Sequence, residues 1–278
     1  MSKMRFYKSD IYVYIFLIIQ IALWNGTRQY KPNFSIVPDV PSKLAIKAIS
    51  LGDEQFYFRT LAFQLQNAGD TFGRFTALRE YNYVKLYHWF KLLDVLDPKS
   101  HFVPSIAAYY FSQTQNTPDV KYVAQYLEEH SEKDLYNKWW WMGQAVYLTN
   151  SKLKDKDWAL RIAYKLSSTP RDDIPMWVKQ MPAFIHEKRG EEEQAMRIVC
   201  DIIKNIENVE QGELNFMTHF VLERLDKRYS NLSQQEQIGR LMADCPQFEK
   251  FYDNTRSAFR DKDEEKAPQQ DVEASKPE

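Results

Sequence analysis

The chain has 278 residues, of which 44% are hydrophobic and 15% aromatic, and its formal charge at pH 7 is −1. A chain with a net charge near zero has no overall positive electrostatic potential to attract a polyanion, which argues against a nucleic-acid-binding protein. The count of eight glycines and the abundance of helix-forming residues favour helices over sheets.

Only two cysteines are present, Cys200 and Cys245. This number excludes a disulfide-built scaffold and a cysteine-rich metal site. Cys200 lies in an apolar stripe, so two buried free thiols are the favoured interpretation. A single disulfide in an oxidising compartment is the alternative.

Residues 11–27 carry no charge and follow a basic flank, residues 1–10. A run of 17 residues is at the lower limit for spanning a bilayer. We therefore predict an N-terminal transmembrane anchor. The alternatives are a cleaved signal peptide, disfavoured because bulky Leu23 and Trp24 follow Ala22, and a buried core helix.

The basic flank places the N-terminus in the cytoplasm and the rest of the chain on the extracytoplasmic side. Arg28 and Lys31 directly after the anchor weaken this bias. Residues 28–43 contain three prolines and are expected to form an extended linker or a snug loop. The last segment, residues 260–278, lacks apolar periodicity and is typical of a disordered charged tail.

Between these segments, residues 44–259 are expected to form one helical-repeat domain. Apolar residues recur there at helical spacing. The expected helices cover residues 51–67, 81–96, 101–113, 119–129, 175–187, 191–206, 212–227 and 233–242, with a terminal turn or two in 248–259.

A central hairpin over residues 138–170 organises this domain. Its two helices are joined by a short charged turn, and Pro170 ends the second helix. Gly143, Ala159 and Ala163 are small residues that let neighbouring helices approach closely. One such hairpin cannot bury its own apolar face, so it must stack on similar hairpins.

Internal repetition supports this stacking. In the second helix of successive pairs, Leu86, Val123, Ala159 and Ala195 fall in equivalent places, at steps of 37, 36 and 36 residues. The pattern resembles the tetratricopeptide repeat, on the positions Trp139, Met142 and Gly143 of a first helix and Ala159, Ala163 and Pro170 of a second. The resemblance covers about residues 50–207, with an insertion at 152–156. It implies an all-α, right-handed α-solenoid of stacked hairpins that binds protein or peptide segments.

Two aromatic regions are candidates for partner binding. Consecutive helical residues are about 100° apart, so Trp139, Trp140 and Trp141 cannot all face one core. At least one of them, with Tyr109 or Tyr110, is expected to contact a partner, a membrane interface or a neighbouring repeat. The second candidate is the loop 69–80, through its residues Phe72, Arg74 and Phe75.

The sequence offers no motif for chemistry. The five histidines are scattered, and no Walker loop, G-x-S-x-G or zinc-ligand spacing occurs. We expect no cofactor, no metal, no nucleic acid and no small-molecule substrate, and a membrane-anchored scaffold or adaptor for a protein partner. The alternatives are an enzyme subunit, or a lipid- or glycan-handling protein that uses an aromatic groove or the 69–80 loop.

Overall fold

The computed structural model describes residues 8–28, 35–71, 73–205, 210–221 and 232–248. Within these ranges the chain is all-α, as expected, apart from one small hairpin. In that hairpin the strands β1 (Asp70–Thr71) and β2 (Arg74–Phe75) pair antiparallel, with Asp70 opposite Phe75. Residues 1–7, the predicted tail 260–278 and most of the expected 248–259 turn lie outside the described residues.

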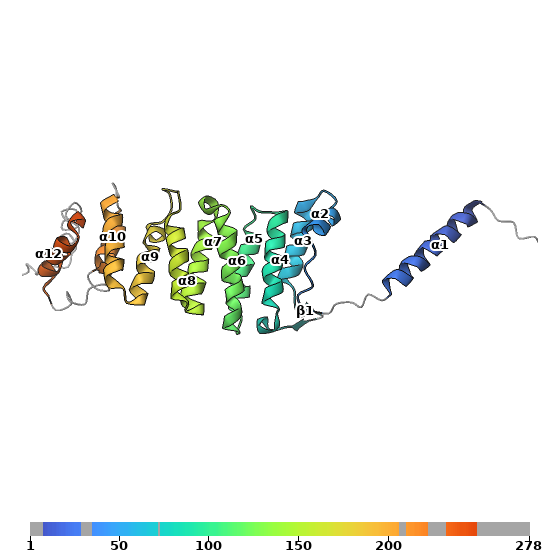
Figure 1. The fold of residues 1–278 in the computed structure, drawn as a ribbon, viewed down its shortest axis with the longest axis horizontal. Coiled ribbons are helices and arrows are strands. Elements are labelled where there is room, and N and C mark those ends of the chain that lie inside the picture. Colours follow the sequence, from blue (N-terminus) through green and yellow to red (C-terminus); the bar gives the residue numbers. More distant parts are fainter. Residues whose placement is uncertain (1–7, 29–34, 72, 206–209, 222–231, 249–278) are drawn as a thin grey trace, which may run out of the picture.

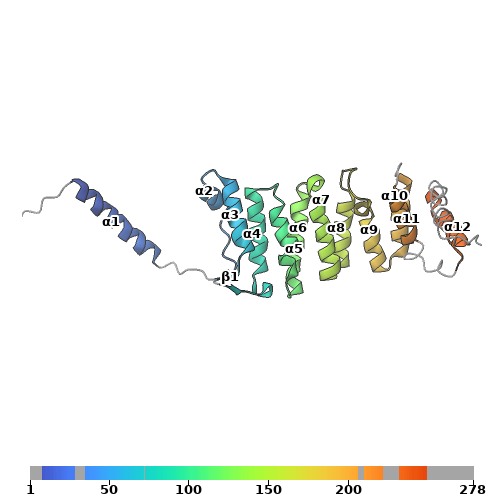
Figure 2. The same cartoon turned by 180° about the vertical axis from the view of Figure 1, so that it is seen from behind.

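The first helix, α1 (Lys8–Thr27), lies apart from the other helices (Figures 1 and 2). Every residue from 11 to 28 is exposed, so the apolar side chains of α1 have no protein core around them. Among the described helices, none is at once long enough and apolar enough to cross a membrane.

The remaining helices lie side by side in a long stack (Figure 1). Their bounds are α2 Lys43–Ile49, α3 Glu54–Gln66, α4 Tyr83–Leu96, α5 Phe102–Tyr109, α6 Val120–Glu132, α7 Leu135–Tyr147, α8 Lys156–Ser167, α9 Met176–Arg189, α10 Glu192–Asn205, α11 Gln211–His219 and α12 Gln234–Asp244. The expected 212–227 helix is described only as far as residue 221.

Local sequence sets where these helices begin and end. Side chains at five N-caps each accept a hydrogen bond from a backbone N–H three residues on: Ser42, Asp53, Asn82, Asp134 and Asp155. Gly190 ends α9 in the left-handed conformation, with φ of 79°, which a residue with a side chain adopts only under strain.

The helices form two rows. From α3 to α10, helices consecutive in the chain pack against each other, while α3 also contacts α5, α5 contacts α7, and α4 contacts α6. Ring contacts continue the α3–α5–α7 series to α9 and α11. Trp177 of α9 packs on Trp139 of α7, and Phe184 of α9 packs on Phe216 of α11. We call α3, α5, α7, α9 and α11 the odd-numbered row, and α4, α6, α8 and α10 the even-numbered row.

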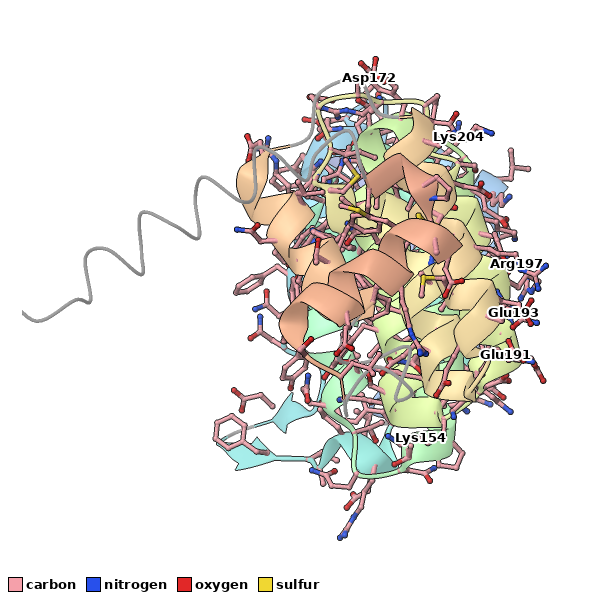
Figure 3. All side chains as sticks on the ribbon, turned by 90° about the vertical axis from the view of Figure 1, so that its left-hand side faces the viewer. Lys154, Asp172, Glu191, Glu193, Arg197 and Lys204 are labelled. Atoms are coloured by element: carbon pink, nitrogen blue, oxygen red, sulfur yellow. A yellow bond between two sulfur atoms is a disulfide. The ribbon has the colours of Figure 1, made fainter. Side chains whose placement is uncertain are left out.

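Small residues let the rows meet closely. Ala107, Ala124, Ala159 and Ala163 are fully buried in the core between the rows. Viewed along the stack in Figure 3, the labelled charged residues Glu193, Arg197 and Lys204 of α10 lie on one side. The core therefore runs between the rows, and each row keeps one face in water.

Residues 35–42, which we call the strap, pack onto the even-numbered row without forming helix or strand. Val37 is buried in the main core, and the Trp89 indole Nε1 donates to the carbonyl oxygen of Pro38 at 2.9 Å. Lys85 Nζ lies 2.6 Å from an oxygen of Asp39. This part of the predicted linker is thus a packed segment of the fold.

The turn of the central hairpin differs from the prediction. Leu148–Leu153 continue α7 directly as a π-helical turn, in place of a short charged loop. The Thr149 hydroxyl donates to the carbonyl of Ala145, and Lys152 Nζ donates to the carbonyl of Ser112 at 2.7 Å. A π turn holds more residues than an α turn, so the inserted residues widen the helix instead of forming a loop.

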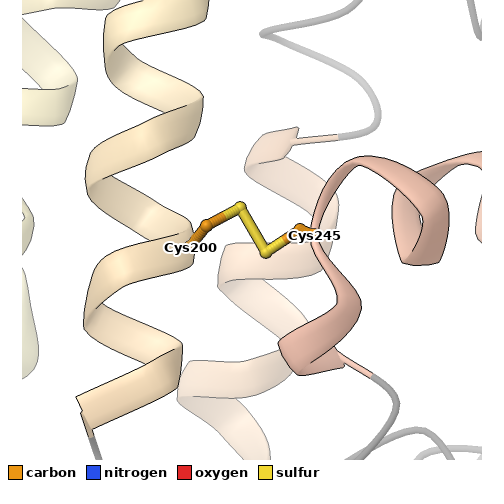
Figure 4. The surroundings of a disulfide bond; sticks show 2 residues. All are labelled: Cys200 and Cys245. Atoms are coloured by element: carbon orange, nitrogen blue, oxygen red, sulfur yellow. A yellow bond between two sulfur atoms is a disulfide. The ribbon is translucent and has the colours of Figure 1, made fainter.

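The two cysteines form a disulfide (Figure 4). Cys200 on α10 is joined to Cys245, which follows α12, across 45 residues of sequence. The favoured interpretation of two free thiols is therefore wrong. The reason is tertiary, because the segment after α12 folds back onto α10 and brings the two Cα atoms to 5.8 Å.

Candidate functional site

Large hydrophobic side chains that stay exposed within the stack gather on the odd-numbered row. They are Phe56 and Phe63 on α3, Phe102 and Tyr109 on α5, Tyr136, Trp140 and Tyr147 on α7, and Phe216 on α11. On the even-numbered row, among the described residues, only Val84 and Tyr164 are exposed in this way. Clustered apolar exposure on one side of a molecule is typical of a binding surface.

The three consecutive tryptophans of α7 point in different directions, as their spacing requires. Trp141 is 6% exposed, and its indole Nε1 donates to Nδ1 of His101 at 2.9 Å. Trp139 is half-buried, and Trp140 is 44% exposed. Trp141 therefore belongs to the core, while Trp140 belongs to the surface.

Four rings form an aromatic patch on this surface: Tyr109, Trp139, Trp140 and Trp177. The ring centroids of Trp139 and Trp140 are 5.8 Å apart, and Trp177 lies 5.9 Å from Trp139 and 6.3 Å from Trp140. The Trp140 indole Nε1 donates to the Tyr109 hydroxyl at 2.8 Å and so joins α7 to α5. Edge-to-face packing of this kind holds the rings in fixed positions.

Gly143 permits the close approach of α9 to α7 beside this patch. A Cβ atom at Gly143 would lie 3.2 Å from the Trp177 ring. A side chain at position 143 would therefore force the Trp177 ring to shift by a few tenths of an ångström.

The surface of α5 and α7 presents no charged side chain to water. α5 contains no charged residue. The only charged residue of α7 is Lys138, which is buried and donates through Nζ to the carbonyl of Pro98 at 2.7 Å. Burial lowers the pKa of the Lys138 ammonium. The four rings of the aromatic patch are therefore uncharged, and the nearest charged groups with printed contacts belong to other segments: the Arg171 guanidinium lies 4.9 Å from the Tyr136 ring centroid, and Glu187 and Lys188 line the adjoining groove.

A groove of about 340 Å³ adjoins the patch, between α7 with its π turn, α9 and α11. Aromatic rings and polar groups line it, including Tyr147, Asn150, Ser151, Phe184, Glu187 and Phe216. Gly143 lines the groove and also contacts Trp177, so the patch and the groove are continuous. The lining thus combines apolar side chains with two charged ones, Glu187 and Lys188, and the groove has room for a side chain of a bound segment.

The second predicted region, the 69–80 loop, forms the small hairpin at one end of the stack (Figure 1). Phe75 is 85% exposed, Phe72 lies outside the described residues, and Arg74 is described only through its place in β2. The Tyr81 hydroxyl donates to the carbonyl of Ala68 and closes the loop. Burial raises the pKa of Tyr81 to about 12.

The two predicted regions do not merge into one site. Tyr110 is exposed but packs edge to face on Phe111, with ring centroids 5.0 Å apart, and is not part of the aromatic patch. The structure thus brings together Tyr109, Trp139 and Trp140, while Trp141 is in the core and the 69–80 loop stands apart.

Charged groups on the even-numbered row pair with one another. The buried carboxylate of Glu128 on α6 accepts hydrogen bonds from three donors on α8: Trp158 Nε1 at 2.7 Å, Arg161 Nη1 at 2.7 Å and Lys165 Nζ at 2.8 Å. These bonds join two neighbouring helices of the row, and the groups that make them have a structural role.

A similar network joins α4 to α6. Glu129 accepts from the Tyr87 hydroxyl at 2.6 Å and lies 2.7 Å from Lys91 Nζ. Burial opposes ionisation of Glu129, but hydrogen bonds from Lys91, Tyr87 and Gln125 outweigh it and hold the pKa of the carboxyl below its ordinary value.

Two further titratable clusters lie between helices. In the interior, Asp94 accepts from the Tyr126 hydroxyl at 2.9 Å and lies 2.7 Å from Nδ1 of His130. Near the α9 terminus, His186 joins the Tyr164 hydroxyl at 2.8 Å to a Glu191 oxygen at 2.5 Å. Within the described ranges, no group of three or more His, Cys, Asp or Glu residues is arranged to hold a metal ion.

The sequence indicated three of the four patch residues, Tyr109, Trp139 and Trp140, but neither Trp177 nor the groove. Tyr147, Phe184 and Phe216 come from three helices and share no local motif. The one sequence signal at the groove is the insertion at 152–156, which is accommodated by the π turn that contributes Asn150 and Ser151.

No protein-family model, no curated protein and no solved structure matches this chain.

Proposed function

We propose that this chain is a membrane-attached helical-repeat scaffold whose odd-numbered row binds a segment of another protein without turnover. The observation that carries the proposal is the concentration of exposed aromatic rings on that row, with the aromatic patch and the groove at its centre.

The repeat class is part of the proposal: an α-solenoid of the tetratricopeptide type. In its support, Leu86, Val123, Ala159 and Ala195 lie on α4, α6, α8 and α10, and all four are fully buried. A repeat of about 36 residues thus puts a buried residue at the same place in each helix of the even-numbered row. Each repeat then contributes one helix to the odd-numbered row and extends the same binding surface.

The energetics of the aromatic patch favour binding. Trp and Tyr bury large areas on association and are the residue types most common at binding hot spots. Trp139, Trp140 and Trp177 are already held by each other, so a partner loses little side-chain entropy in ordering them. The four rings are themselves uncharged, so covering them avoids the free-energy cost of removing water from unpaired charges.

The helix α1 is proposed to attach the scaffold to a membrane. Its exposed apolar side chains, among them Ile11, Phe16 and Leu23, are unfavourable in water and favourable in lipid. The charge-free run of 17 residues measures about 26 Å as a helix, somewhat shorter than the hydrocarbon thickness of about 30 Å. Extraction of membranes at pH 11 tests attachment, and the chain should stay with the lipid unless residues 1–27 are deleted.

The stack is proposed to lie on the extracytoplasmic side of that membrane. The Cys200–Cys245 disulfide supports this location, because disulfides persist in oxidising compartments. Alkylation of the full chain, trapped in cells before lysis, should find both thiols blocked. Two reactive thiols would contradict the location.

Capture of a protein partner tests the binding function. The full chain, crosslinked in its own cells, should retain a defined partner that the Trp140→Ala variant loses. Loss of a hot-spot ring costs about 2 kcal/mol or more in binding, which is roughly thirtyfold in affinity. The thermal melt should stay nearly unchanged, because Trp140 is already half in water.

The matched control is Tyr164→Ala on the even-numbered row, where an aromatic ring of similar exposure is removed. Equal loss of the partner from both variants, or unfolding of Trp140→Ala, would contradict the proposal.

A further inference from the structure

We propose that the segment that covers the aromatic patch is rich in proline, extended, and uncharged where it touches the four rings. This inference rests on the proposed function, and it specifies the chemistry of the partner segment.

The charge of the surface limits what can bind there. α5 carries no charged residue, and the single lysine of α7 is buried against the carbonyl of Pro98. A charged side chain of a partner placed on the four rings would lose water there and gain no opposite charge from α5 or α7, which is unfavourable. The segment that covers the aromatic patch should therefore lack charge where it touches the patch.

The hydrogen-bonding groups of the patch favour a segment that accepts hydrogen bonds. The Tyr109 hydroxyl oxygen accepts from Trp140 Nε1, and its own hydrogen has no acceptor among the described residues. Tyr109 is 50% exposed, so this hydrogen is available to a bound molecule. A proline-rich chain presents carbonyl acceptors and few N–H donors, because proline has no N–H.

The chain itself provides an example of this contact. The Trp89 indole donates to the carbonyl of Pro38 at 2.9 Å, and Val37 beside it is fully packed in the core. Residues Val37 to Pro41 read Val-Pro-Asp-Val-Pro, outside helix and strand. An indole on the even-numbered row thus already holds a proline-containing segment of the same chain that is neither helix nor strand.

Aromatic surfaces with hydroxyl and indole donors are well matched to the polyproline II conformation. Such a segment is already extended before it binds, so ordering it costs little entropy. Proline rings pack flat against Tyr and Trp. The patch provides four rings, and the continuous groove provides space for a flanking side chain.

Binding of two immobilised peptides to the full chain in detergent tests the inference. The probes are a poly-L-proline decamer and an uncharged amphipathic helical peptide of Leu, Gln and Ala. The decamer should bind, and the helical peptide should bind at least about tenfold more weakly. Tyr109→Phe keeps the ring and removes the hydroxyl, so it should weaken decamer binding about two- to tenfold, the range for one hydrogen bond. Trp140→Ala should weaken it further.

The control is Tyr164→Phe, the same change on an exposed tyrosine of the even-numbered row, which should leave decamer binding unchanged. Tighter binding of the helical peptide, with loss in Trp140→Ala, would overturn the inference and leave the proposed function standing. Absence of decamer binding, or decamer binding insensitive to both Tyr109→Phe and Trp140→Ala, would also overturn it. The proposed function fails separately, if partner capture in cells does not depend on Trp140.

Discussion

Trp140 on the odd-numbered row and Glu128 on the even-numbered row each form a hydrogen bond to a neighbouring helix, but they leave different surfaces behind. Trp140 donates to Tyr109, and both rings stay about half exposed. Glu128 accepts from Trp158, Arg161 and Lys165 and is almost fully buried. The first contact keeps an apolar surface open to a partner, while the second closes a polar group inside the fold.

The difference extends along the stack. The even-numbered row joins its helices by charge-assisted bonds, and a partner that covered them would have to compete with pairs already made. The odd-numbered row joins its helices by ring contacts between Trp139, Trp140 and Trp177, and by those of Phe184 with Phe216. Covering such rings removes apolar area from water, which is favourable, and does not require any ion pair to be broken or desolvated. One row thus serves mainly for stability, and the other is open for binding.

The largest expected effect on stability comes from a substitution that prevents the close packing of the two rows at Ala163. Ala163 on α8 is fully buried, so Ala163→Trp overpacks the core and should cost about 3 kcal/mol or more in the free energy of unfolding. In a stacked array the damage should spread mainly to neighbouring hairpins. Hydrogen exchange should show protection lost over residues 100–205, with less effect on α3 and α4.

Tyr164→Trp, one residue further along α8 and exposed, is the control; it loses the hydroxyl hydrogen bond to His186 and should cost no more than about 1 kcal/mol. Uniform loss of protection over the whole stack in Ala163→Trp would indicate one cooperative core and would contradict the repeat account.

A smaller effect should separate the two rows. Glu128→Ala leaves Trp158, Arg161 and Lys165 without their shared acceptor. Arg161 and Lys165 remain partly solvated, so we expect a loss of about 2 kcal/mol in stability instead of the larger cost of a fully buried pair. Partner binding should be retained, the reverse of Trp140→Ala, and chemical denaturation with the capture assay measures both.

For comparison, Glu132→Ala removes an exposed carboxylate that pairs with the same Lys165 and should cost under about 1 kcal/mol. If Glu128→Ala abolishes binding at a temperature where the chain is folded, the even-numbered row takes part in recognition and the division of roles is wrong.

The smallest expected effect is the pH dependence of the stability that Glu129 contributes to the even-numbered row. The folded pKa of Glu129 lies below its ordinary value of 4.5, because hydrogen bonds from Lys91, Tyr87 and Gln125 outweigh its burial. A lowered folded pKa means that its contribution to stability is full above about pH 4.5 and is lost as the pH falls through the folded pKa. For a partly exposed pair we expect less than about 1 kcal/mol.

Thermal melts of the wild type and Glu129→Gln between pH 7 and pH 3 measure this contribution. The wild type should be the more stable at pH 7, and the gap should narrow toward pH 3. A gap that widens as the pH falls would reverse the sign and contradict the account.

The parts of this fold that depend on local pattern were predictable, and the parts that depend on distant contacts were not. Helical spacing indicated α4, α6, α8 and α10 within a few residues, and 100° rotation per residue indicated that Trp139, Trp140 and Trp141 cannot all face the core, without saying which of them is exposed. The disulfide depends on the return of the chain after α12, and the groove depends on three helices meeting at Tyr147, Phe184 and Phe216. No local pattern carries either contact.

Two further features show why the turn at residues 152–156 and the linker at residues 28–43 were harder to predict from the sequence. The charged residues at 152–156 predict a solvated turn, but Lys152 is held by the carbonyl of Ser112 and the π turn becomes part of α7. The prolines in residues 28–43 predict an extended linker or a snug loop, and residues 35–42 are neither helix nor strand. Their packing on Trp89 depends on α4, about fifty residues away.

Site-specific photocrosslinking of the full chain in its own membrane tests the central claim most directly. Benzoylphenylalanine would replace Tyr109 and Tyr147 on the odd-numbered row, and Tyr122 and Tyr164 on the even-numbered row, one position at a time. The account predicts crosslinks to the same protein partner from Tyr109 and Tyr147, and none from Tyr122 and Tyr164. Crosslinks that form equally from both rows, or only from Tyr122 and Tyr164, would contradict the assignment of binding to the odd-numbered row.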